Sequence, residues 1–499
     1  MSNILFINPC YEGSTSDFSC GLLSIGSYLE TKGYKINLLF SSENLEDIDL
    51  YLDEKTIYIG ISAMTVQIPE ALKVIKYVKE KNKKVKIVFG GYHSTLFPEQ
   101  TIKHEMVDFA IVGDAEETCL ELTKALEGKK EIKDIKGLVW KKDGKIIFNE
   151  KRDFTNNLEL PRMNYSLIHD YKPIKRVAES GNKVNTGVVY SAKGCPFACT
   201  FCINSAMKKN WQSRKLEYIM DEIEYLVKEK NVTNIYLVDE NFFTKKERFF
   251  QFLDEIEKRE LKFEWTPQCR AGYIKDNYLS IDVLKRMKKL GCKCVLLGIE
   301  SGSQEMLNRM KKGLLVSQVF TAVEGLKEAG IIPKLTFMIG MPGEEKEDML
   351  KTFKLIYEIS KIVPDFHLIG PCIFRPYPGS LMYERIVELG YKPPKRLEDW
   401  EFTDSSWNDR YLLEKSSWIK EKELVMDIKD TLYAYVKFRN EKRFKLARFF
   451  LKRVYNQEKL MDFLLKNVPK LDLSAKSIFR PDLREVYSRL IRQTKSLKL

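Results

Sequence analysis

Short apolar segments alternate with longer amphipathic ones along about the first 130 residues of the chain. A short apolar run bounded by turn residues predicts a buried strand, and apolar residues three and four positions apart predict a helix. The expected strands are residues 4–8, 35–40, 57–62, 85–89 and 108–112, and the expected helices are residues 22–32, 69–82 and 116–127. Strands separated by helices of this length form βαβ units around a parallel sheet. We therefore expect a doubly wound, Rossmann-like α/β domain over residues 1–137.

The same alternation returns after a stretch without a clear pattern. That stretch, residues 138–185, contains an Asp143-Gly144 turn between two apolar runs, with Pro161 and Pro173 beyond it, and is expected to be a linker. The strands expected next are residues 188–191, 234–238, 264–268, 294–298, 334–339 and 367–374, with helices such as 215–230 and 316–329 between them. Six such units predict a partial (β/α)6 barrel over residues 186–395, whose chemistry gathers at the carboxyl ends of the strands.

The last part of the chain, residues 396–499, loses the strand pattern and is expected to be a helical extension. Leu424, Ile428 and Leu432 recur at helical spacing. The net charge of the whole chain is +13, and residues 431–499 alone carry 18 Lys and Arg against 6 Asp and Glu. Phenylalanines among these basic residues are typical of an interfacial helix that contacts an acidic membrane surface, although nucleic acid is another acidic partner. The alternative is a tail that packs on the barrel with its charges solvated.

Composition narrows the class of protein. Hydrophobic residues make up 44% of the chain, enough for sizeable packed cores. No apolar run approaches the ~20 residues of a membrane-spanning helix, and the N-terminus has no secretory signal pattern, so we expect a cytoplasmic protein. Ten cysteines in such a chain indicate metal or redox chemistry rather than a disulfide framework.

The most informative motif is AKGCPFACTFC, which directly follows the first barrel strand. It places Cys195, Cys199 and Cys202 on one short loop. Three thiolates so spaced can hold three irons of a [4Fe–4S] cluster and leave the fourth iron open for an amino acid chelate, such as the methionine end of S-adenosylmethionine. A structural zinc ion is the alternative. Zinc needs a fourth ligand, and the nearest histidine in sequence, His169, has no paired spacing with these cysteines.

With this motif, residues 3–390 resemble radical S-adenosylmethionine enzymes that carry an N-terminal cobalamin-binding-type domain. The motifs YLVDENFF, LLGIESGS, FMIGMPGEE and FRPYPGS follow successive barrel strands in the order expected of that family. Taken singly, each motif is also explained without a ligand, as a carboxylate at the end of a strand or a glycine in a turn. The resemblance implies contacts to S-adenosylmethionine from Phe201 and the Gly340–Gly343 turn at the adenine, from Asp239 and Glu240 at the amino group, and from Glu300 and Ser301 at the ribose and carboxylate. Arg375 and Tyr377 resemble the barrel-closing motif.

The N-terminal domain carries the matching segments INPCYEG, GLLSIGSYL, VFGGYHST and VDFAIVGDAEET. The resemblance implies that Gly90, Gly91, His93 and Gly113 frame a cobalamin pocket at the strand ends. The DxHxxG motif that ligates cobalt in some cobalamin proteins is absent, so we expect no lower histidine ligand from this domain. A hydrogen-bonded loop histidine is the simpler interpretation of His93. The GxGxxG fingerprint of nicotinamide binding is absent as well.

The remaining cysteines form no convincing ligand set. Buried cysteines behave as small hydrophobic residues, and we expect this of them all. The alternative for any one is a thiol hydrogen donor or a second cluster ligand. They are Cys10, Cys20, Cys119, Cys269, Cys292, Cys294 and Cys372.

The resemblance implies an activity but no substrate and no catalytic residue. One electron, from a donor such as flavodoxin or ferredoxin, cleaves S-adenosylmethionine to a 5′-deoxyadenosyl radical, which abstracts hydrogen from an unactivated carbon. With methylcobalamin above the substrate, C-methylation is the expected outcome. The alternatives are an oxidative cyclase or a carbon–carbon coupling or rearrangement enzyme on a hydrophobic or lipid substrate, and, outside enzymes, a cobalamin sensor or carrier with an inert barrel. Methylthiolation of tRNA is disfavoured, because three further cluster cysteines and a C-terminal β-barrel are not apparent.

Overall fold

The computed structural model of the chain describes residues 3–9, 19–40, 45–168, 171–207, 210–403, 409–426, 428–429 and 432. The expectation of a basic helical tail beyond residue 432 therefore lies outside the described residues, as does the one for Cys10. Within the described part, every helix is too short or too polar to cross a membrane.

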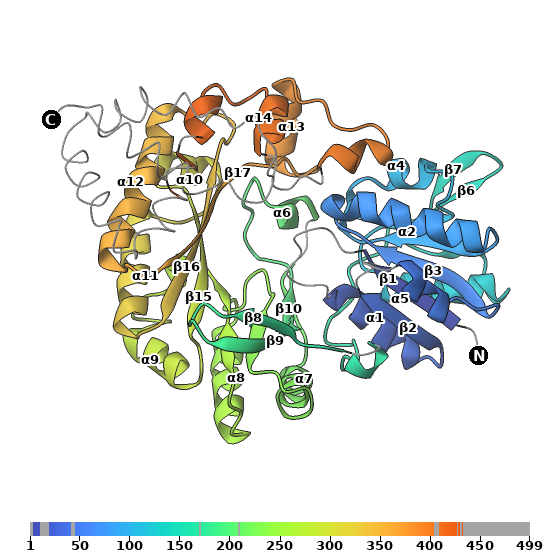
Figure 1. Ribbon diagram of the computed structural model, residues 1–499, viewed down its shortest axis with the longest axis horizontal. Helices are drawn as coiled ribbons and strands as arrows, with labels where there is room; N and C mark the ends of the chain where they lie inside the picture. The colour runs from blue at the N-terminus through green and yellow to red at the C-terminus, as the bar shows by residue number, and fades with distance from the viewer. Residues whose placement is uncertain are drawn as a thin grey trace.

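The N-terminal unit is a seven-stranded sheet with helices on both faces (Figure 1). Its strand order is β2-β1-β3-β4-β5-β6-β7, and the pairs from β2 to β5 are parallel. The strands are β1 (Asn3–Asn8), β2 (Lys35–Phe40), β3 (Thr56–Ser62), β4 (Lys86–Gly90), β5 (Phe109–Ile111), β6 (Leu138–Lys142) and β7 (Lys145–Phe148). The helices are α1 (Cys20–Glu30), α2 (Ile68–Lys81), α3 (Tyr92–Leu96), α4 (Pro98–Lys103) and α5 (Glu116–Leu126). The predicted doubly wound fold is confirmed.

Strand β1 is buried on both faces, because successive side chains of a strand point to opposite sides. Ile4 and Phe6 join an apolar cluster that includes Leu22 of α1. Leu5 and Ile7 join the cluster on the other face. A central parallel strand must satisfy both layers, which is why it is an uninterrupted apolar run in the sequence.

The hairpin of β6 and β7 corrects the predicted linker. It was expected to lie outside the first domain, but β6 pairs antiparallel with β5 and continues the sheet. The Asp143-Gly144 turn has the expected backbone, with φ of 49° and 75°. Strand β5 would otherwise leave an edge of unpaired N–H and C=O groups, and the hairpin covers it. The N-terminal unit therefore extends to about residue 148.

The second unit is a partial barrel made of two four-stranded sheets, ordered β13-β12-β9-β8 and β14-β15-β16-β17. Its strands are β8 (Ile174–Val177), β9 (Lys183–Val189), β12 (Asn234–Leu237), β13 (Glu264–Thr266), β14 (Gln268–Cys269), β15 (Cys294–Glu300), β16 (Ile332–Ile339) and β17 (His367–Ile373). The helices around it are α7 (Leu216–Glu229), α8 (Lys246–Lys258), α9 (Ile281–Lys289), α10 (Gln304–Arg309), α11 (Val316–Glu328), α12 (Lys346–Ile362), α13 (Leu381–Glu388) and α14 (Asp409–Lys415). All six predicted strands are present.

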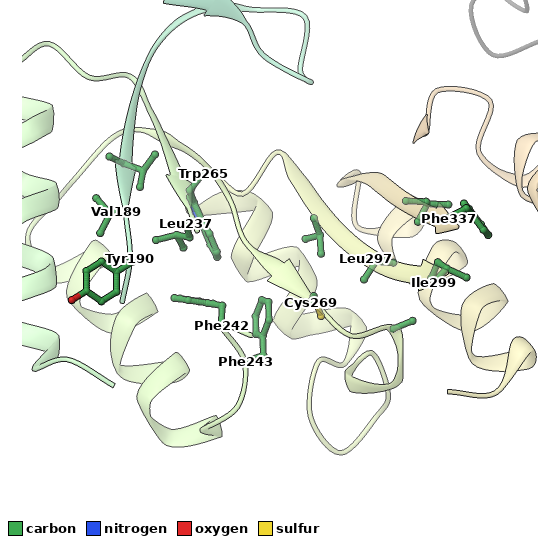
Figure 2. Close-up of a cluster of buried hydrophobic side chains, with 14 of the residues drawn as sticks. Val189, Tyr190, Leu237, Phe242, Phe243, Trp265, Cys269, Leu297, Ile299 and Phe337 are labelled. Atoms are coloured by element: carbon green, nitrogen blue, oxygen red, sulfur yellow. The ribbon is translucent and has the colours of Figure 1, made fainter. Parts of the chain in front are cut away.

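The third predicted strand is divided at Pro267 into β13 and β14. Proline has no N–H to donate to a ladder, so the strand changes partner there. Strand β13 pairs with β12, whereas β14 pairs with β15. Figure 2 shows the resulting interior, where Leu237, Trp265, Leu297 and Phe337 are fully buried across both sheets.

The open side of the barrel is held by Glu179, at the turn between β8 and β9. Its carboxylate lies 2.7 Å from Nζ of Lys334 at the start of β16, and its carbonyl lies 3.1 Å from Nε2 of His367 at the start of β17. Burial opposes ionisation, but Lys334 outweighs it and lowers the pKa of Glu179 to about 2. The end of the predicted linker, in β8, is therefore part of the barrel wall.

Contacts among the described residues join the two units, and three of them lie in separate parts of the fold. Lys193, near the first barrel strand, lies 3.3 Å from the Glu116 carboxylate at the start of α5. The backbone N–H of Asn164 donates to Ser27 Oγ in α1 at 2.8 Å. Trp400, in the short helix η6 (Glu398–Thr403), donates to Gln100 Oε1 in α4 at 2.6 Å. Figure 1 shows this last segment reaching from α13 back to α4.

Candidate functional site

The cysteine loop lies between the short strand β10 (Ala192–Lys193) and the helix α6 (Ile203–Met207). Gly194 turns the chain with a φ of 77°, and its N–H donates to Glu240 Oε2 at 3.1 Å. Thr200 fixes the middle of the loop, since its N–H donates to the Met310 carbonyl at 2.9 Å and its own carbonyl accepts from the Met382 N–H at 3.1 Å. The loop is thus tied to three separate parts of the barrel.

The three thiols fit a [4Fe–4S] cluster. Burial raises the pKa of both Cys195 and Cys202, and the neighbouring Cys199 raises each further, so the three lie within electrostatic reach of one another. Across the described residues, no three Cys, His, Asp or Glu side chains converge on a point that could hold a single metal ion. A cubane cluster offers each thiolate its own iron, so its ligands need not converge on one point.

Arg270 is a residue of this site that the sequence analysis missed. It follows β14 directly, and its Nη1 lies 3.9 Å from Cys199 Sγ. Its guanidinium lies 3.6 Å from the centre of the Phe197 ring, within the cysteine loop itself. The signal was its place at a strand carboxyl end, where a barrel collects its chemistry.

The two adjacent carboxylates predicted at the amino group of S-adenosylmethionine, Asp239 and Glu240, have different surroundings. Asp239 is fully buried and accepts hydrogen bonds from the N–H and the hydroxyl of Ser191, so its carboxylate holds the end of the first barrel strand. Burial, its largest influence, raises the pKa of Asp239. Glu240 is partly exposed beside the cysteine loop. Of the two, Glu240 is the one placed to face a ligand.

Glu300 and Ser301 lie at the end of β15. Glu300 has a φ of 74°, a left-handed conformation that is uncommon for a residue with a side chain. Its carboxylate pairs with Lys312 Nζ at 2.9 Å and accepts from Thr336 Oγ1 at 3.2 Å. Ser301 is fully buried and lies 3.2 Å from Thr352 Oγ1. In this structure Ser301 stabilises the turn, and the contacts predicted for both residues remain predictions.

The glycine turn after β16 is packed against protein. A Cβ on Gly340 would come within 2.7 Å of Ile419, and Trp418 Nε1 donates to the Gly340 carbonyl at 2.9 Å. A Cβ on Gly343 would lie 2.9 Å from Arg309. Both neighbours are the ends of flexible side chains, so it is the left-handed backbone, with φ of 78° at Gly340 and 74° at Gly343, that favours glycine at each position. The contact predicted between this turn and adenine remains a prediction. Phe201 is half-buried with Lys312 Nζ 5.8 Å from its ring.

Three glycines lie at the carboxyl edge of the N-terminal sheet. Gly113, after β5, has a φ of 89°, and among the described residues no atom beyond its chain neighbours lies within 4 Å of a Cβ placed there. At Gly90 the nearest such atom lies at 3.9 Å. Gly91 is different, since a Cβ would lie 2.8 Å from the backbone of Ala63, and this glycine lets two loops meet. That these glycines frame a cobalamin pocket remains a prediction.

His93 is fully buried, and its ring centre lies 5.1 Å from that of Phe97 and 5.4 Å from that of Trp400. Burial lowers the pKa of His93 to about 3, so the ring is neutral. Its Nδ1 lies 3.2 Å from Thr65 Oγ1. In this structure His93 packs between the N-terminal unit and η6, and its part in framing a cobalamin pocket remains a prediction.

Lys193 connects the end of β5 with the cysteine loop. It directly precedes Gly194, and its Nζ lies 3.6 Å from the carboxylate of Asp114, which directly follows Gly113. Tyr92, after Gly91, is 36% exposed; partial burial raises the pKa of its phenol, and Glu240, Asp114 and Cys202 add to that rise. The carboxyl end of β5 and the cysteine loop are therefore neighbours.

The remaining predicted residues lie near the barrel mouth or in the core. Tyr377 is 44% exposed, and Arg375 and Cys372 are near enough to influence its pKa. Cys372 is the exposed one among the described cysteines outside the loop, and Cys20 is half-buried. The others are buried, as expected: Cys119, Cys269, Cys292 and Cys294.

Comparison with known proteins identifies both units. Residues 189–356 match the Radical SAM superfamily, and residues 17–123 match the B12 binding domain. An uncharacterized methyltransferase of Pyrococcus horikoshii is 32% identical over 332 residues, which cover 66% of this chain and 69% of the relative. The bacteriochlorophyllide d C-8(2)-methyltransferase of Chlorobaculum tepidum is 25% identical over 89% of this chain and 91% of its own.

Solved structures show the same arrangement of the fold. The cobalamin-dependent S-adenosylmethionine radical enzyme OxsB, with aqua-cobalamin and S-adenosylmethionine bound, matches 99% of this chain and 80% of its own with a TM-score of 0.68 at 16% identity. The radical S-adenosylmethionine methyltransferase TsrM of Kitasatospora setae, with cobalamin and cluster bound, matches 78% of this chain and 75% of its own with a TM-score of 0.61 at 18% identity.

These matches imply a [4Fe–4S] cluster, S-adenosylmethionine and cobalamin as cofactors. That Cys195, Cys199 and Cys202 hold the cluster remains a prediction, with which the geometry of the thiol loop agrees. The chain belongs to the radical S-adenosylmethionine superfamily, as an enzyme whose barrel follows an N-terminal B12-binding domain.

Proposed function

We propose that this enzyme transfers a methyl group to an unactivated carbon of a small molecule. The observation that carries the proposal is the pairing of Lys193 with Asp114 and Glu116, which places the end of β5 beside the cysteine loop. A substrate held there would face the cobalamin site and the cluster site together. The named activities of the Pyrococcus horikoshii and Chlorobaculum tepidum relatives support the same reaction class.

When bound, the reduced cluster and S-adenosylmethionine supply hydrogen abstraction, and cobalamin supplies the methyl group. The chain's own residues position these groups and exclude water. Glu240 holds the entry to the cysteine loop through the Gly194 N–H and is offered to the amino group of S-adenosylmethionine. Lys193, paired with Glu116, holds the two units at a set distance. Tyr92 forms the boundary between them.

An oxidative ring closure is the second candidate. The anaerobic magnesium-protoporphyrin IX monomethyl ester cyclase of Rubrivivax gelatinosus is 26% identical over 78% of this chain and 70% of its own. The two reactions differ in their products. Methyl transfer consumes S-adenosylmethionine both as methyl donor and as radical source, whereas ring closure needs no methyl donor.

Anaerobic turnover separates the two candidates. The full chain is reconstituted with iron, sulfide and hydroxocobalamin, then given S-adenosylmethionine and a flavodoxin or ferredoxin reducing system. Because no methyl acceptor is supplied, methyl transfer predicts 5′-deoxyadenosine together with S-adenosylhomocysteine in an amount limited by the bound cobalamin. 5′-Deoxyadenosine without any S-adenosylhomocysteine, from protein that shows cobalamin absorption, contradicts methyl transfer and favours the cyclase. The Cys199→Ser variant is the control, since loss of one cluster ligand removes the 5′-deoxyadenosine.

Contact of the basic tail with an anionic membrane surface is a separate part of the proposal. The charge of residues 431–499 supports it. Sedimentation with phosphatidylglycerol vesicles, compared with a chain ending at residue 430, tests it. Binding that is equal for the two chains contradicts a role of the tail.

A further inference from the structure

Arg270 is half-buried beside the cysteine loop, and among the described residues no Asp or Glu oxygen lies within 4 Å of its guanidinium. Its polar contacts are the carbonyls of Lys312 and Gly313 and the sulfur of Cys199. A cation withdrawn from water needs a compensating negative charge. Cys199, as a thiolate ligand of the cluster, would provide that negative charge 3.9 Å from Nη1 of Arg270.

Its position is also restrained. The Phe197 ring covers one face of the guanidinium at 3.6 Å, and the carbonyls of Lys312 and Gly313 accept from Nη2. Phe197 lies between two of the cluster cysteines in sequence, so the arginine is attached to the cysteine loop itself. A planar guanidinium fixed by stacking and by two acceptors keeps one orientation towards Cys199.

Lys312 offers a contrast within the same wall. Its ammonium group lies 2.9 Å from the Glu300 carboxylate, so its charge is already paired. Burial raises the pKa of Cys202 and Lys312 still opposes that rise, but the Glu300 carboxylate offsets part of the field of Lys312 at the cysteine loop. Among the described residues Arg270 has no such carboxylate partner, and its Nη1 lies 3.9 Å from Cys199 Sγ.

We propose that Arg270, through its charge beside Cys199, raises the reduction potential of the [4Fe–4S] cluster. Reduction adds one electron, and so one negative charge, to the cluster and its three thiolates. A fixed cation near Cys199 stabilises the reduced form more than the oxidised form, because Coulomb energy scales with charge. Hydrogen bonds to cluster sulfurs and local net charge are known determinants of such potentials.

The test is a dithionite titration of the reconstituted full chain, without S-adenosylmethionine, followed by the electron paramagnetic resonance signal of the reduced cluster. Arg270→Gln removes the charge, and the ratio of reduced to oxidised cluster at a fixed potential should fall at least tenfold, a midpoint shift of 59 mV for one electron. Arg270→Lys should retain most of the potential. Arg309→Gln is the matched control, because that arginine also holds a backbone carbonyl but pairs with Glu305.

Each outcome decides the proposal. An unchanged midpoint potential in Arg270→Gln overturns the proposal. If that variant also binds S-adenosylmethionine more weakly, Arg270 is a ligand contact instead. If Arg270→Gln does not load a cluster, Phe197→Ala carries the test. Phe197→Ala keeps the charge of Arg270 but removes the ring that restrains the guanidinium. It should lower the midpoint potential by less than Arg270→Gln does. If the midpoint potential of Phe197→Ala is unchanged, the proposal is overturned. The test depends on the cluster and not on methyl transfer, so the two proposals fail separately.

Discussion

Glu344, after β16, is a buried carboxyl group whose ionisation can be followed as a change in stability. Its Oε2 accepts from the backbone N–H groups of Gly340 at 2.6 Å and Met341 at 3.0 Å. Its Oε1 is buried with no hydrogen-bond partner among the described residues. Burial is the largest influence and raises the pKa of Glu344 from 4.5 to about 7; the two N–H groups oppose this rise and Asp348 adds to it.

The sign of the effect follows from the direction of the shift. The folded chain binds this proton more tightly than the unfolded chain does. The contribution of Glu344 to stability is therefore fully present below pH 4.5 and is lost as the pH rises through 7. At 1.36 kcal/mol per unit, the difference between 4.5 and about 7 amounts to about 3 kcal/mol.

Glu344→Gln isolates this effect, because glutamine keeps an acceptor oxygen and stays neutral at every pH. We expect the free energy of unfolding of the variant, relative to the natural chain, to increase by about 3 kcal/mol between pH 4.5 and pH 8. Urea titrations followed by circular dichroism at pH 4.5, 6 and 8 measure it. The exposed Glu347→Gln, on the neighbouring helix, is the control. A difference that is the same at all three pH values would refute the reasoning.

Three further predictions concern the framework around the site. Arg214→Met should cost about 3–5 kcal/mol in urea titrations, because it leaves the Glu222 carboxylate buried and unpaired; Arg214→Met with Glu222→Leu should recover much of that loss. Gly91→Ala should abolish cobalamin absorption while the cluster band persists, because a Cβ would meet the Ala63 backbone at 2.8 Å with a φ of 91°; cobalamin retained at the natural level would contradict this. Trp400→Ala should raise amide hydrogen exchange in α3 and α4, because the segment η6 loses its hydrogen bond and ring contacts to the N-terminal unit; unchanged exchange would show that η6 does not hold the units together.

Local pattern was sufficient for the strands and for the cysteine loop. A parallel strand that is buried on both faces is apolar over its whole length. Residues such as Ile4 and Leu5 therefore predict the strand without tertiary information. The spacing of Cys195, Cys199 and Cys202 is likewise local, since the three lie on one loop. Pattern was insufficient where pairing depends on a distant edge, as for β6, which covers β5.

Tertiary structure alone separated residues that look equivalent in sequence. Asp239 and Glu240 are adjacent carboxylates, but the chain turns one towards Ser191 and the other towards the cysteine loop. His93 and Gly340 lie in motifs that suggest a ligand, yet Trp400 and Ile419, from far along the chain, cover them.

The hydrophobic period was enough to predict the two α/β units and their order, and the spacing within one loop was enough to predict Cys195, Cys199 and Cys202 as cluster ligands. Which polar groups face the site, which are enclosed, and that Arg270 lies against Cys199 became visible only in the folded chain. Those properties depend on which distant segments pack together, and no local pattern of residues encodes the charge or the space that such a neighbour brings.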